Sequence, residues 1–380
     1  MHIALNGWFW DQVNVGSGQY LRYLLGSLRR VSPETRFTLV LPSRIQQPAD
    51  VPAGVEVVTV KAFGGNVGKV WFEQRAFPAA AGRVKADIAH VPYWAPPLAS
   101  PVPLVVSILD VVALMIPDYS YGFAARLYTS LVSAGAQGAN HVITLTQASK
   151  NDIIQQLGLP AENITPTHLA VDDAYHPRMG AERDKAVREK YQLPDDYIFY
   201  IGGFDVRKQV NQLLLAYTYV AQAEGDDYPL VIAGREPQWG TRMFPDMRRY
   251  AEELNISRHI HWLGYVDEAD KPSLYRMAKL FVSPTLYEGF GLPVLEAMAS
   301  GTPVVANDIA SIAEIVGDGA YLTETGSARQ MAGAMIALLE QKPLRDTLIN
   351  QGLAQATRFS WRKTALETLK VYEKVLNHGT

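Results

Sequence analysis

Short apolar runs that alternate with amphipathic segments are the feature that most constrains the fold of this chain. The runs are rich in Val, Ile and Leu and lack regular polar alternation, which is typical of strands covered on both faces. In the first half the expected strands are His2–Asn6, Phe37–Leu41, Val55–Val60, Asp87–Val91, Leu104–Leu109 and His141–Leu145. In the second half they are Tyr197–Ile201, Leu230–Ala233, His259–Leu263, Leu280–Ser283 and Val304–Ala306. The pattern predicts parallel sheets with helices on either side, the α/β class.

Helical patterns lie between these strands, and the same rhythm occurs in both halves of the chain. The expected helices are Gly18–Val31, Gln209–Ala223, Arg242–Leu254, Pro293–Ser300 and Ala328–Glu340. At 380 residues the chain is long for one domain and comfortable for two. The charged segment Asp172–Asp196 contains two prolines and is the expected linker region, so we place the domains at residues 1–180 and 181–360. Ligands of such sheets bind outside the carboxyl ends of the strands.

Charge and cysteine content narrow the functional class. Thirty-five basic and 38 acidic residues give a formal charge of −3, which does not favour a nucleic-acid partner. The chain has no cysteine, so it has no disulfide framework and no thiolate chemistry. The N-terminus lacks the basic region of a signal peptide, and the longest apolar stretch, Val102–Pro117, is short for a membrane span. We therefore expect a cytoplasmic protein, with attachment to the inner face of the membrane left open.

The most informative motif lies in the segment Leu280–Ala306, which has the pattern strand, glycine-bearing loop, helix, strand. Glu288 and Glu296 flank the junction of loop and helix with seven residues between them, and Pro293 marks the helix start. A helix N-terminus suits an anion. Carboxylates aimed at that anion would repel it. They are better explained as acceptors for hydroxyl groups next to the anion, as in a sugar nucleotide. Taken singly, Glu288 also fits a solvated loop, and Glu296 fits an acid that the dipole favours in the first helical turn.

The whole combination resembles the E-x7-E signature of the retaining family-4 glycosyltransferases. The resemblance implies the GT-B fold, in which two Rossmann-like domains with parallel sheets face each other across a deep cleft. It implies that Glu288 approaches the transferred sugar and that Glu296 binds the nucleotide ribose. The backbone of the loop would approach the sugar and diphosphate, which assigns Gly289, Phe290, Gly291 and Leu292 to donor binding. Because chain ends in this family often cross back, the expected helix over residues 361–380 would join the first domain; a terminal helix of the second domain is the alternative.

A basic pair follows the expected strand Tyr197–Ile201. Arg207 and Lys208 stand just before the expected helix, where cations oppose the macrodipole unless an anion lies between them. A solvated surface pair is the alternative. The resemblance assigns the donor diphosphate to Lys208 with help from Arg207. Many relatives carry an arginine where this chain has Gly203, which shifts more of the charge onto Arg207 or loosens the grip on the diphosphate.

Weaker signals come from the first half. The glycines Gly16 and Gly18 precede a helix and correspond in the family to a loop that faces the donor diphosphate, although a plain flexible loop fits as well. Asp110 ends a strand where many relatives carry His-Asp, and here Leu109 replaces the histidine. The family histidine is thought to contact the transferred sugar. His90 and His168 could compensate, but satisfied structural histidines are the commoner outcome.

Two aromatic segments leave alternatives open. Pro92–Pro97 would lie at the carboxyl edge of a strand, where its rings could stack on an acceptor sugar or pack on a neighbouring loop. A second set could rest on a membrane surface, although such a stripe is more often a buried helix face. That set is Trp71, Phe72, Arg75, Phe77 and Arg83. No metal-ligand motif, Asp-x-Asp pair, P-loop or G-x-S-x-G elbow is present, so we expect no metal site and no cofactor beyond the donor.

These features together predict a retaining, metal-independent glycosyltransferase of polysaccharide biosynthesis. Arg207, Lys208, the glycine loop and the helix N-termini would neutralise the departing diphosphate, and Glu288 would orient the sugar. Residues 109–119 resemble bacterial mannosyl- and rhamnosyl-type enzymes, which favours GDP-mannose as the donor. The acceptor would be a saccharide or a lipid-linked saccharide. The alternatives are a relative that binds sugar nucleotides without turnover, a GT-B-fold epimerase, and a phosphorylase, for which no cofactor-bearing lysine is evident.

Overall fold

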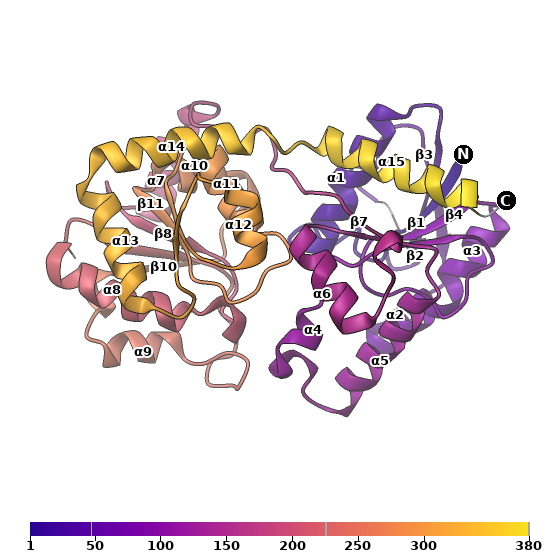
Figure 1. The fold of residues 1–380 in the computed structure, drawn as a ribbon, viewed down its shortest axis with the longest axis horizontal. Coiled ribbons are helices and arrows are strands. Elements are labelled where there is room, and N and C mark those ends of the chain that lie inside the picture. Colours follow the sequence, from indigo (N-terminus) through magenta and orange to yellow (C-terminus); the bar gives the residue numbers. More distant parts are fainter. Residues whose placement is uncertain (47, 225, 379–380) are drawn as a thin grey trace. The chain divides into compact units, whose positions relative to one another are not determined.

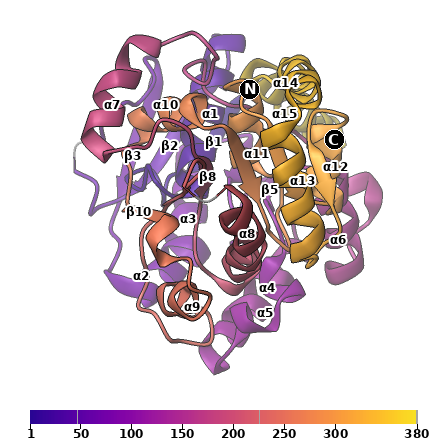
Figure 2. The same cartoon turned by 90° about the vertical axis from the view of Figure 1, so that its left-hand side faces the viewer.

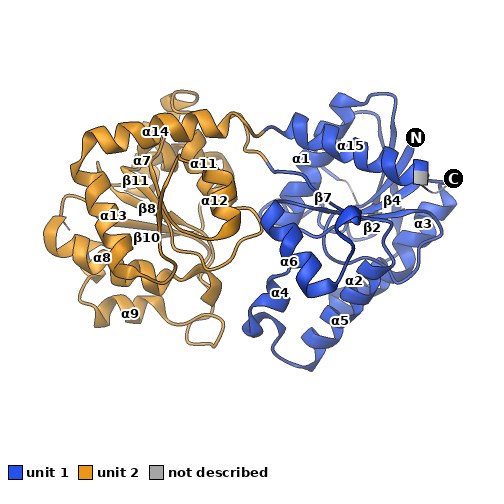
Figure 3. Cartoon of the chain, viewed as in Figure 1, with its two compact units in different colours: residues 1–169, 360–380 blue, residues 170–359 orange. Residues whose placement is uncertain are grey.

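The computed structural model describes residues 1–46, 48–224 and 226–378, and it divides into two compact units. The first unit comprises Met1–Leu169 and Ser360–Thr380, and the second comprises Ala170–Phe359 (Figure 3). The first unit therefore ends before the boundary expected at residue 180. None of the helices in the described ranges combines the length and apolar character needed to cross a membrane.

The first unit is built on a parallel sheet with the strand order β3-β2-β1-β4-β5-β6-β7. The strands are β1 His2–Asn6, β2 Arg36–Pro42, β3 Val55–Val60, β4 Ile88–Val91, β5 Leu104–Ser107, β6 His141–Thr144 and β7 Ile164–Pro166. The helices are α1 Gly16–Val31, α2 Gly65–Trp71, α3 Phe77–Arg83, α4 Val112–Met115, α5 Phe123–Gln137, α6 Gln147–Leu157 and α15 Trp361–His378. A π-helical turn, η1 Phe72–Ala76, joins α2 to α3. The chain order reverses direction between β1 and β4, which makes this pair the topological switch point.

The second unit repeats the plan with the strand order β10-β9-β8-β11-β12-β13. The strands are β8 Ile198–Ile201, β9 Leu230–Ala233, β10 Ile260–Gly264, β11 Leu280–Ser283, β12 Val304–Asn307 and β13 Tyr321–Thr323. The helices are α7 Asp184–Tyr191, α8 Val210–Glu224, α9 Met247–Glu253, α10 Lys271–Met277, α11 Leu292–Ala299, α12 Ala310–Val316, α13 Ala328–Glu340 and α14 Lys342–Ala356. Here the switch point lies between β8 and β11.

The central strand β8 shows why the second sheet is apolar on both faces. Ile198 and Tyr200 pack with α8 and α13, which lie side by side over one face (Figure 2). Phe199 packs on the other face with residues of α10 and α11. Successive side chains of a strand point to opposite faces, so a strand covered on both sides carries no polar alternation. The α/β class and the parallel sheets predicted from this pattern are confirmed.

Three details differ from the sequence expectations. The segment Asp172–Asp196 is not a linker but part of the second unit, because α7 within it places Val187 in a hydrophobic core. The helix expected over Arg242–Leu254 is shorter in the structure, where α9 begins only after Asp246. The side chain of Asp246 caps this helix by accepting a hydrogen bond from Arg249 N. The short strands β7 and β13 were not predicted, because three residues of mixed polarity carry too little periodic signal.

The C-terminal helix α15 packs on α1 within the first unit (Figure 1). Trp361 stacks on Tyr23 with a centroid distance of 5.1 Å. Deeper in the interface, the Tyr372 hydroxyl lies 2.6 Å from His90 Nδ1, and His90 Nε2 lies 2.8 Å from Ser107 Oγ. His90 is fully buried on β4. It is therefore a satisfied structural histidine rather than a ligand-binding group.

This buried histidine predicts an acid-dependent loss of stability. Burial lowers the pKa of His90 to about 3, well below its usual 6.5. Between these values the unfolded chain binds a proton that the folded chain does not, so stability falls as the pH drops. From pH 6.5 to 5 the contribution is about 2 kcal/mol at ~1.4 kcal/mol per pH unit. We expect urea unfolding of the wild type to show this slope and His90→Asn to show a shallower one; equal slopes would contradict the prediction.

Candidate functional site

The switch point of the second sheet brings the basic pair and the first glutamate together. The loop after β8 carries Arg207 and Lys208, and the loop after β11 carries Glu288. Because β8 and β11 are neighbouring parallel strands, their carboxyl ends meet at one edge of the sheet. The two loops are joined directly, since Leu286 N donates to Arg207 O at 2.9 Å. The geometry thus places side by side two motifs that lie far apart in the sequence.

Both cations contact the Glu288 carboxylate. Arg207 Nη1 lies 2.8 Å from Glu288 Oε2, and Lys208 Nζ forms an ion pair with Glu288 Oε1. The three side chains are 15–17% exposed, so the cluster is half-buried yet reachable from solvent. Thr285 Oγ1 adds a hydrogen bond to Oε1 at 3.4 Å. Burial raises the pKa of Glu288, but the charges of Lys208 and Arg207 outweigh burial and hold this pKa below its usual range.

The basic pair does not sit in the first turn of an α-helix. Arg207 and Lys208 belong to a 3₁₀ turn, Val206–Lys208, and α8 starts two residues later at Val210. Gln209, which lies between this 3₁₀ turn and α8, has a left-handed backbone with φ 50°. Arg207 is held further by Tyr287 O at 2.9 Å and by Asp205 at 3.5 Å. Nothing in the sequence singled out Asp205, because its contact with Arg207 is created by the fold of this turn.

The glycine loop turns sharply into α11. Gly291 has φ 101°, and a Cβ there would fall 2.3 Å from Ile312 Cδ1, so only glycine fits. Phe290 is 3% exposed and packs edge-on against Phe359, which leaves its backbone rather than its ring for a ligand. The helix α11 begins at Leu292, one residue before the expected start, and Pro293 lies in its first turn. Gly289 precedes this turn. Gly203 lies in the other loop, after β8, where a Cβ would meet only Asp205 Oδ2 at 3.0 Å.

Glu296 lies apart from the cation cluster. It is the fifth residue of α11, so the expectation that it falls in the first helical turn is wrong. Its side chain is 9% exposed, and Tyr275 OH donates to Oε2 at 2.7 Å. Burial raises the pKa of Glu296. Tyr275 on α10 is a partner that sequence reasoning missed, because tyrosine in a short helix gives no signal of its own.

Among the candidate residues of the first unit, Gly18 and Asp110 have structural roles in the unit itself. Gly18 packs so closely on the preceding loop that a Cβ would lie 2.2 Å from Gln12 O, whereas Gly16 at the start of α1 has open space around it. Asp110 Oδ1 accepts a hydrogen bond from Val112 N at 3.0 Å, where α4 begins. His168 O accepts from Thr364 Oγ1 of α15.

The stripe from Trp71 to Arg83 is split between core and surface. Phe72 and Phe77 are fully buried, as the helix-face alternative expects. Trp71, Arg75 and Arg83 instead line a shallow hollow of about 540 Å³.

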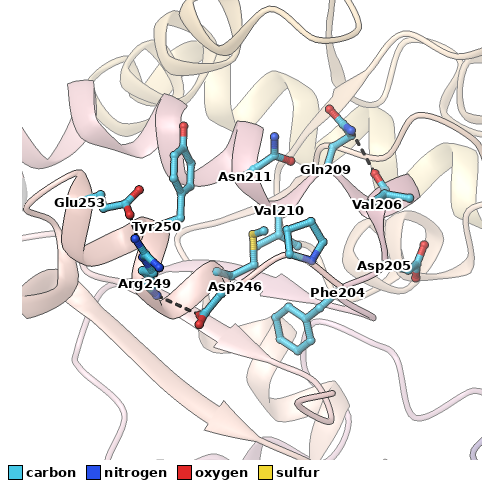
Figure 4. Close-up of a pocket in the computed structure, with 12 residues that line it drawn as sticks. Phe204, Asp205, Val206, Gln209, Val210, Asn211, Asp246, Arg249, Tyr250 and Glu253 are labelled. Atoms are coloured by element: carbon cyan, nitrogen blue, oxygen red, sulfur yellow. Dashed lines mark hydrogen bonds and ion pairs between the residues drawn. The ribbon is translucent and has the colours of Figure 1, made fainter. Parts of the chain in front are cut away.

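A further cavity of about 470 Å³ lies beside the loop after β8 (Figure 4). It is lined on one side by Asp205, Gln209 and Asn211 and on the other by Arg249 and Glu253 of α9. Neither Lys208 nor Glu288 lines it, so it adjoins the cation cluster without including it. Across the described residues, no group of three or more His, Asp or Glu side chains is placed to hold a metal ion.

Two family models match most of the chain in consecutive segments. The model described as "Glycosyltransferase Family 4" matches residues 16–175, and the model described as "Glycosyl transferases group 1" matches residues 183–355. The O-antigen chain mannosyltransferase B of Escherichia coli is 32% identical over 70% of this chain and 68% of its own length. The serotype-specific mannosyltransferase WbdA of Escherichia coli is 28% identical over 63% of this chain. The matched segment makes up only 29% of the length of WbdA.

Solved structures share the architecture at low identity. The lipopolysaccharide glycosyltransferase WaaG superposes with a TM-score of 0.74 at 16% identity, covering 97% of this chain and 99% of its own. The chain therefore has the GT-B fold, with two Rossmann-like units.

Proposed function

The chain belongs to the family-4 glycosyltransferases, and we propose that it transfers a mannosyl group from GDP-mannose to a saccharide, free or lipid-linked, with retention of anomeric configuration. Its place among these glycosyltransferases makes it an enzyme of glycan biosynthesis. The observation that carries the finer proposal is the cluster of Arg207, Lys208 and Glu288 at the switch point of the second sheet. The mannosyl donor is supported by the relatives, which are named mannosyltransferases.

The cation pair addresses the main electrostatic problem of the reaction. Negative charge grows on the nucleotide diphosphate as the bond between sugar and oxygen breaks. Arg207 and Lys208 are fixed in a 3₁₀ turn, so they need little reorganisation to meet this charge. The backbone of Gly289–Leu292 at the start of α11 adds peptide dipoles of the same sign. We propose that these groups neutralise the leaving group without a divalent ion.

Glu288 is the counter-ion that a bound diphosphate would replace. The diphosphate would compete with the carboxylate for Lys208 and Arg207, and the released carboxylate would accept hydrogen bonds from sugar hydroxyls. Its pKa is held low by the two cations, so it is ionised at neutral pH. An ionised carboxylate beside the anomeric carbon would stabilise the positive charge that develops there. Glu296, buried against Tyr275, is the proposed partner of the ribose hydroxyls.

The candidate residues of the first unit keep the ligand roles expected from the sequence. We propose that Gly16 and Gly18 approach the donor diphosphate through their backbone and that Asp110 contacts the transferred sugar. Leu109 cannot supply the hydrogen bond that a histidine would give there. The basic residues around Trp71, for which the described part of the chain offers no carboxylate partner, are the proposed point of contact with a membrane surface when the acceptor is lipid-linked.

The test is a donor screen followed by product analysis. We expect GDP to raise the thermal unfolding midpoint of the protein more than UDP, because binding to the folded state alone stabilises it. With radiolabelled GDP-mannose and a mannoside acceptor, we expect an α-linked product by NMR and an unchanged rate after EDTA treatment. Binding without transfer or donor hydrolysis would favour a non-catalytic protein. A changed free sugar nucleotide without acceptor would indicate an epimerase, and loss of activity that Mg²⁺ restores would refute metal independence.

A further inference from the structure

The switch point of the first sheet carries a polar cluster that the donor chemistry does not use. Asn6 ends β1 and Phe9 follows it in the next loop. Tyr93 lies in the loop after β4. The rings of Phe9 and Tyr93 meet edge-on with centroids 4.7 Å apart. Since ligands of open α/β sheets bind at the switch point, this is the place where the first unit is built to receive one.

A buried carboxylate lies beneath these rings. Glu73 sits in the π-helical turn η1 and is 0% exposed. Its Oε2 accepts a hydrogen bond from Tyr128 OH at 3.2 Å, and its Oε1 lies 3.5 Å from Lys69 Nζ. π-Helical turns are rare and occur often at functional sites. Burial raises the pKa of Glu73 to about 7, so retaining this side chain in the core costs stability that a purely structural residue would not need.

Lys69 is the member of the cluster that reaches solvent. Its side chain is 26% exposed, and Nζ donates to Tyr128 OH at 3.1 Å. The ammonium also lies 5.0–5.7 Å from the ring centroids of Phe9, Tyr93 and Tyr128. An ammonium has three donors, and the described residues offer this one only Tyr128 and Glu73 as polar partners. One donor is therefore available to a ligand.

Two buried donors nearby also lack partners among the described residues. Asn6 is fully buried; its Oδ1 accepts from Tyr93 OH and Trp8 N, but its Nδ2 has no acceptor. Trp94 Nε1, in the loop after β4, is likewise without an acceptor. Buried donors are rarely left unsatisfied, because each costs about 1–3 kcal/mol. Such donors on β1 and in the loop after β4, together with the exposed ammonium of Lys69, favour a ligand rich in oxygen acceptors.

The loop that carries Tyr93 and Trp94 is held rigidly by the same π-helical turn. Gln74 Nε2 donates to Pro96 O at 3.1 Å, and Leu98 N donates to Gln74 Oε1 at 2.9 Å. The aromatic surface is thus pre-organised, which lowers the entropic cost of binding a sugar ring.

We propose that Lys69, positioned by Glu73 and Tyr128, is a specificity-determining residue of the first unit and donates a hydrogen bond to a hydroxyl of a neutral saccharide acceptor. This inference rests on the proposed function, because a saccharide bound here is an acceptor only if the protein transfers a sugar to it. The site selects a neutral sugar because the ammonium is balanced by the Glu73 carboxylate and surrounded by rings that stack on sugar C–H faces. Three other cations of the first unit, Lys61, Arg75 and Arg83, have no carboxylate partner in the described ranges and line a different hollow.

The test measures saccharide affinity by calorimetry in the presence of saturating GDP. The probes are neutral manno-, gluco- and galacto-oligosaccharides, with mannose 6-phosphate as the anionic comparison. We expect a neutral oligosaccharide to bind, Lys69→Met to weaken it at least tenfold, and Lys69→Arg to restore part of the loss. Lys85→Met, which replaces an exposed lysine that precedes β4 at the opposite edge of the same sheet, should change nothing, and GDP affinity should be unaltered in all variants.

A pH series separates ligand contact from a structural role. The titratable groups facing Glu73 are Lys69 on α2, Tyr93 after β4 and Tyr128 on α5. Above pH 7 the ionised Glu73 holds Lys69 and Tyr128 in place, so neutral-sugar affinity should rise from pH 6 to 8, and Glu73→Gln should flatten this rise. Wild-type affinity in Lys69→Met, or no binding of any neutral saccharide to the wild type, would overturn the proposal. Failure of GDP to bind would instead contradict the donor site.

Discussion

Lys208→Ala is expected to lower kcat/KM for sugar transfer by about 10²–10³-fold, the loss seen when one fixed donor to a developing negative charge is removed. This corresponds to about 3–4 kcal/mol of transition-state stabilisation. The fold should survive, because Lys208 is a half-buried loop residue and Arg207 still neutralises Glu288 in the variant. Initial rates with radiolabelled donor measure the loss, and circular dichroism and the thermal midpoint check the fold.

Lys279→Ala is the matched control. Lys279 immediately precedes β11 in the same unit, at the amino end of the strand, and pairs with Asp196 at 3.3 Å. It therefore lies at the sheet edge opposite the switch-point cluster and should leave kcat/KM unchanged. Wild-type turnover in Lys208→Ala, or an equal loss in both variants, would remove Lys208 from the charge-neutralising role.

The sequence was sufficient for the fold class because buried parallel strands leave a direct signal. Runs such as Leu280–Ser283 are apolar throughout since both faces are covered, and their spacing with helices predicts parallel sheets. Boundaries were less predictable where the signal was compositional. The charged segment Asp172–Asp196 was expected as a linker, yet Val187 and Tyr191 dock α7 on a core. Charge on the exposed face of a short helix cannot be distinguished from charge in a linker without tertiary contacts.

The candidate site was predictable as a set of residues but not as a geometry. Arg207, Lys208 and Glu288 could be selected from local patterns, whereas their mutual ion pairs depend on β8 and β11 being neighbours. The sequence alone does not reveal strand order. For the same reason Glu73 gave no signal, because its burial and its partners Lys69 and Tyr128 come from three separate elements. Isolated polar residues become informative only when their burial is known.

Glu288→Gln is expected to separate donor binding from turnover. The amide keeps the shape of the side chain but removes the charge that balances Arg207 and Lys208. Both cations then face the diphosphate without competition, so GDP should bind about tenfold more tightly, a gain of ~1.4 kcal/mol. At the same time kcat should fall by about 10²–10³-fold, because the amide cannot stabilise positive charge at the anomeric carbon.

Calorimetry with GDP and single-turnover rates with radiolabelled donor measure the two effects independently. Glu340→Gln, an exposed glutamate at the end of α13 in the same unit, should alter neither quantity. The opposite signs of the two effects make the test sharp, because a damaged fold would weaken binding and turnover together. Tighter GDP binding with a normal kcat would show that Glu288 is only a counter-ion for the basic pair, and the proposed role of its carboxylate at the sugar would have to be abandoned.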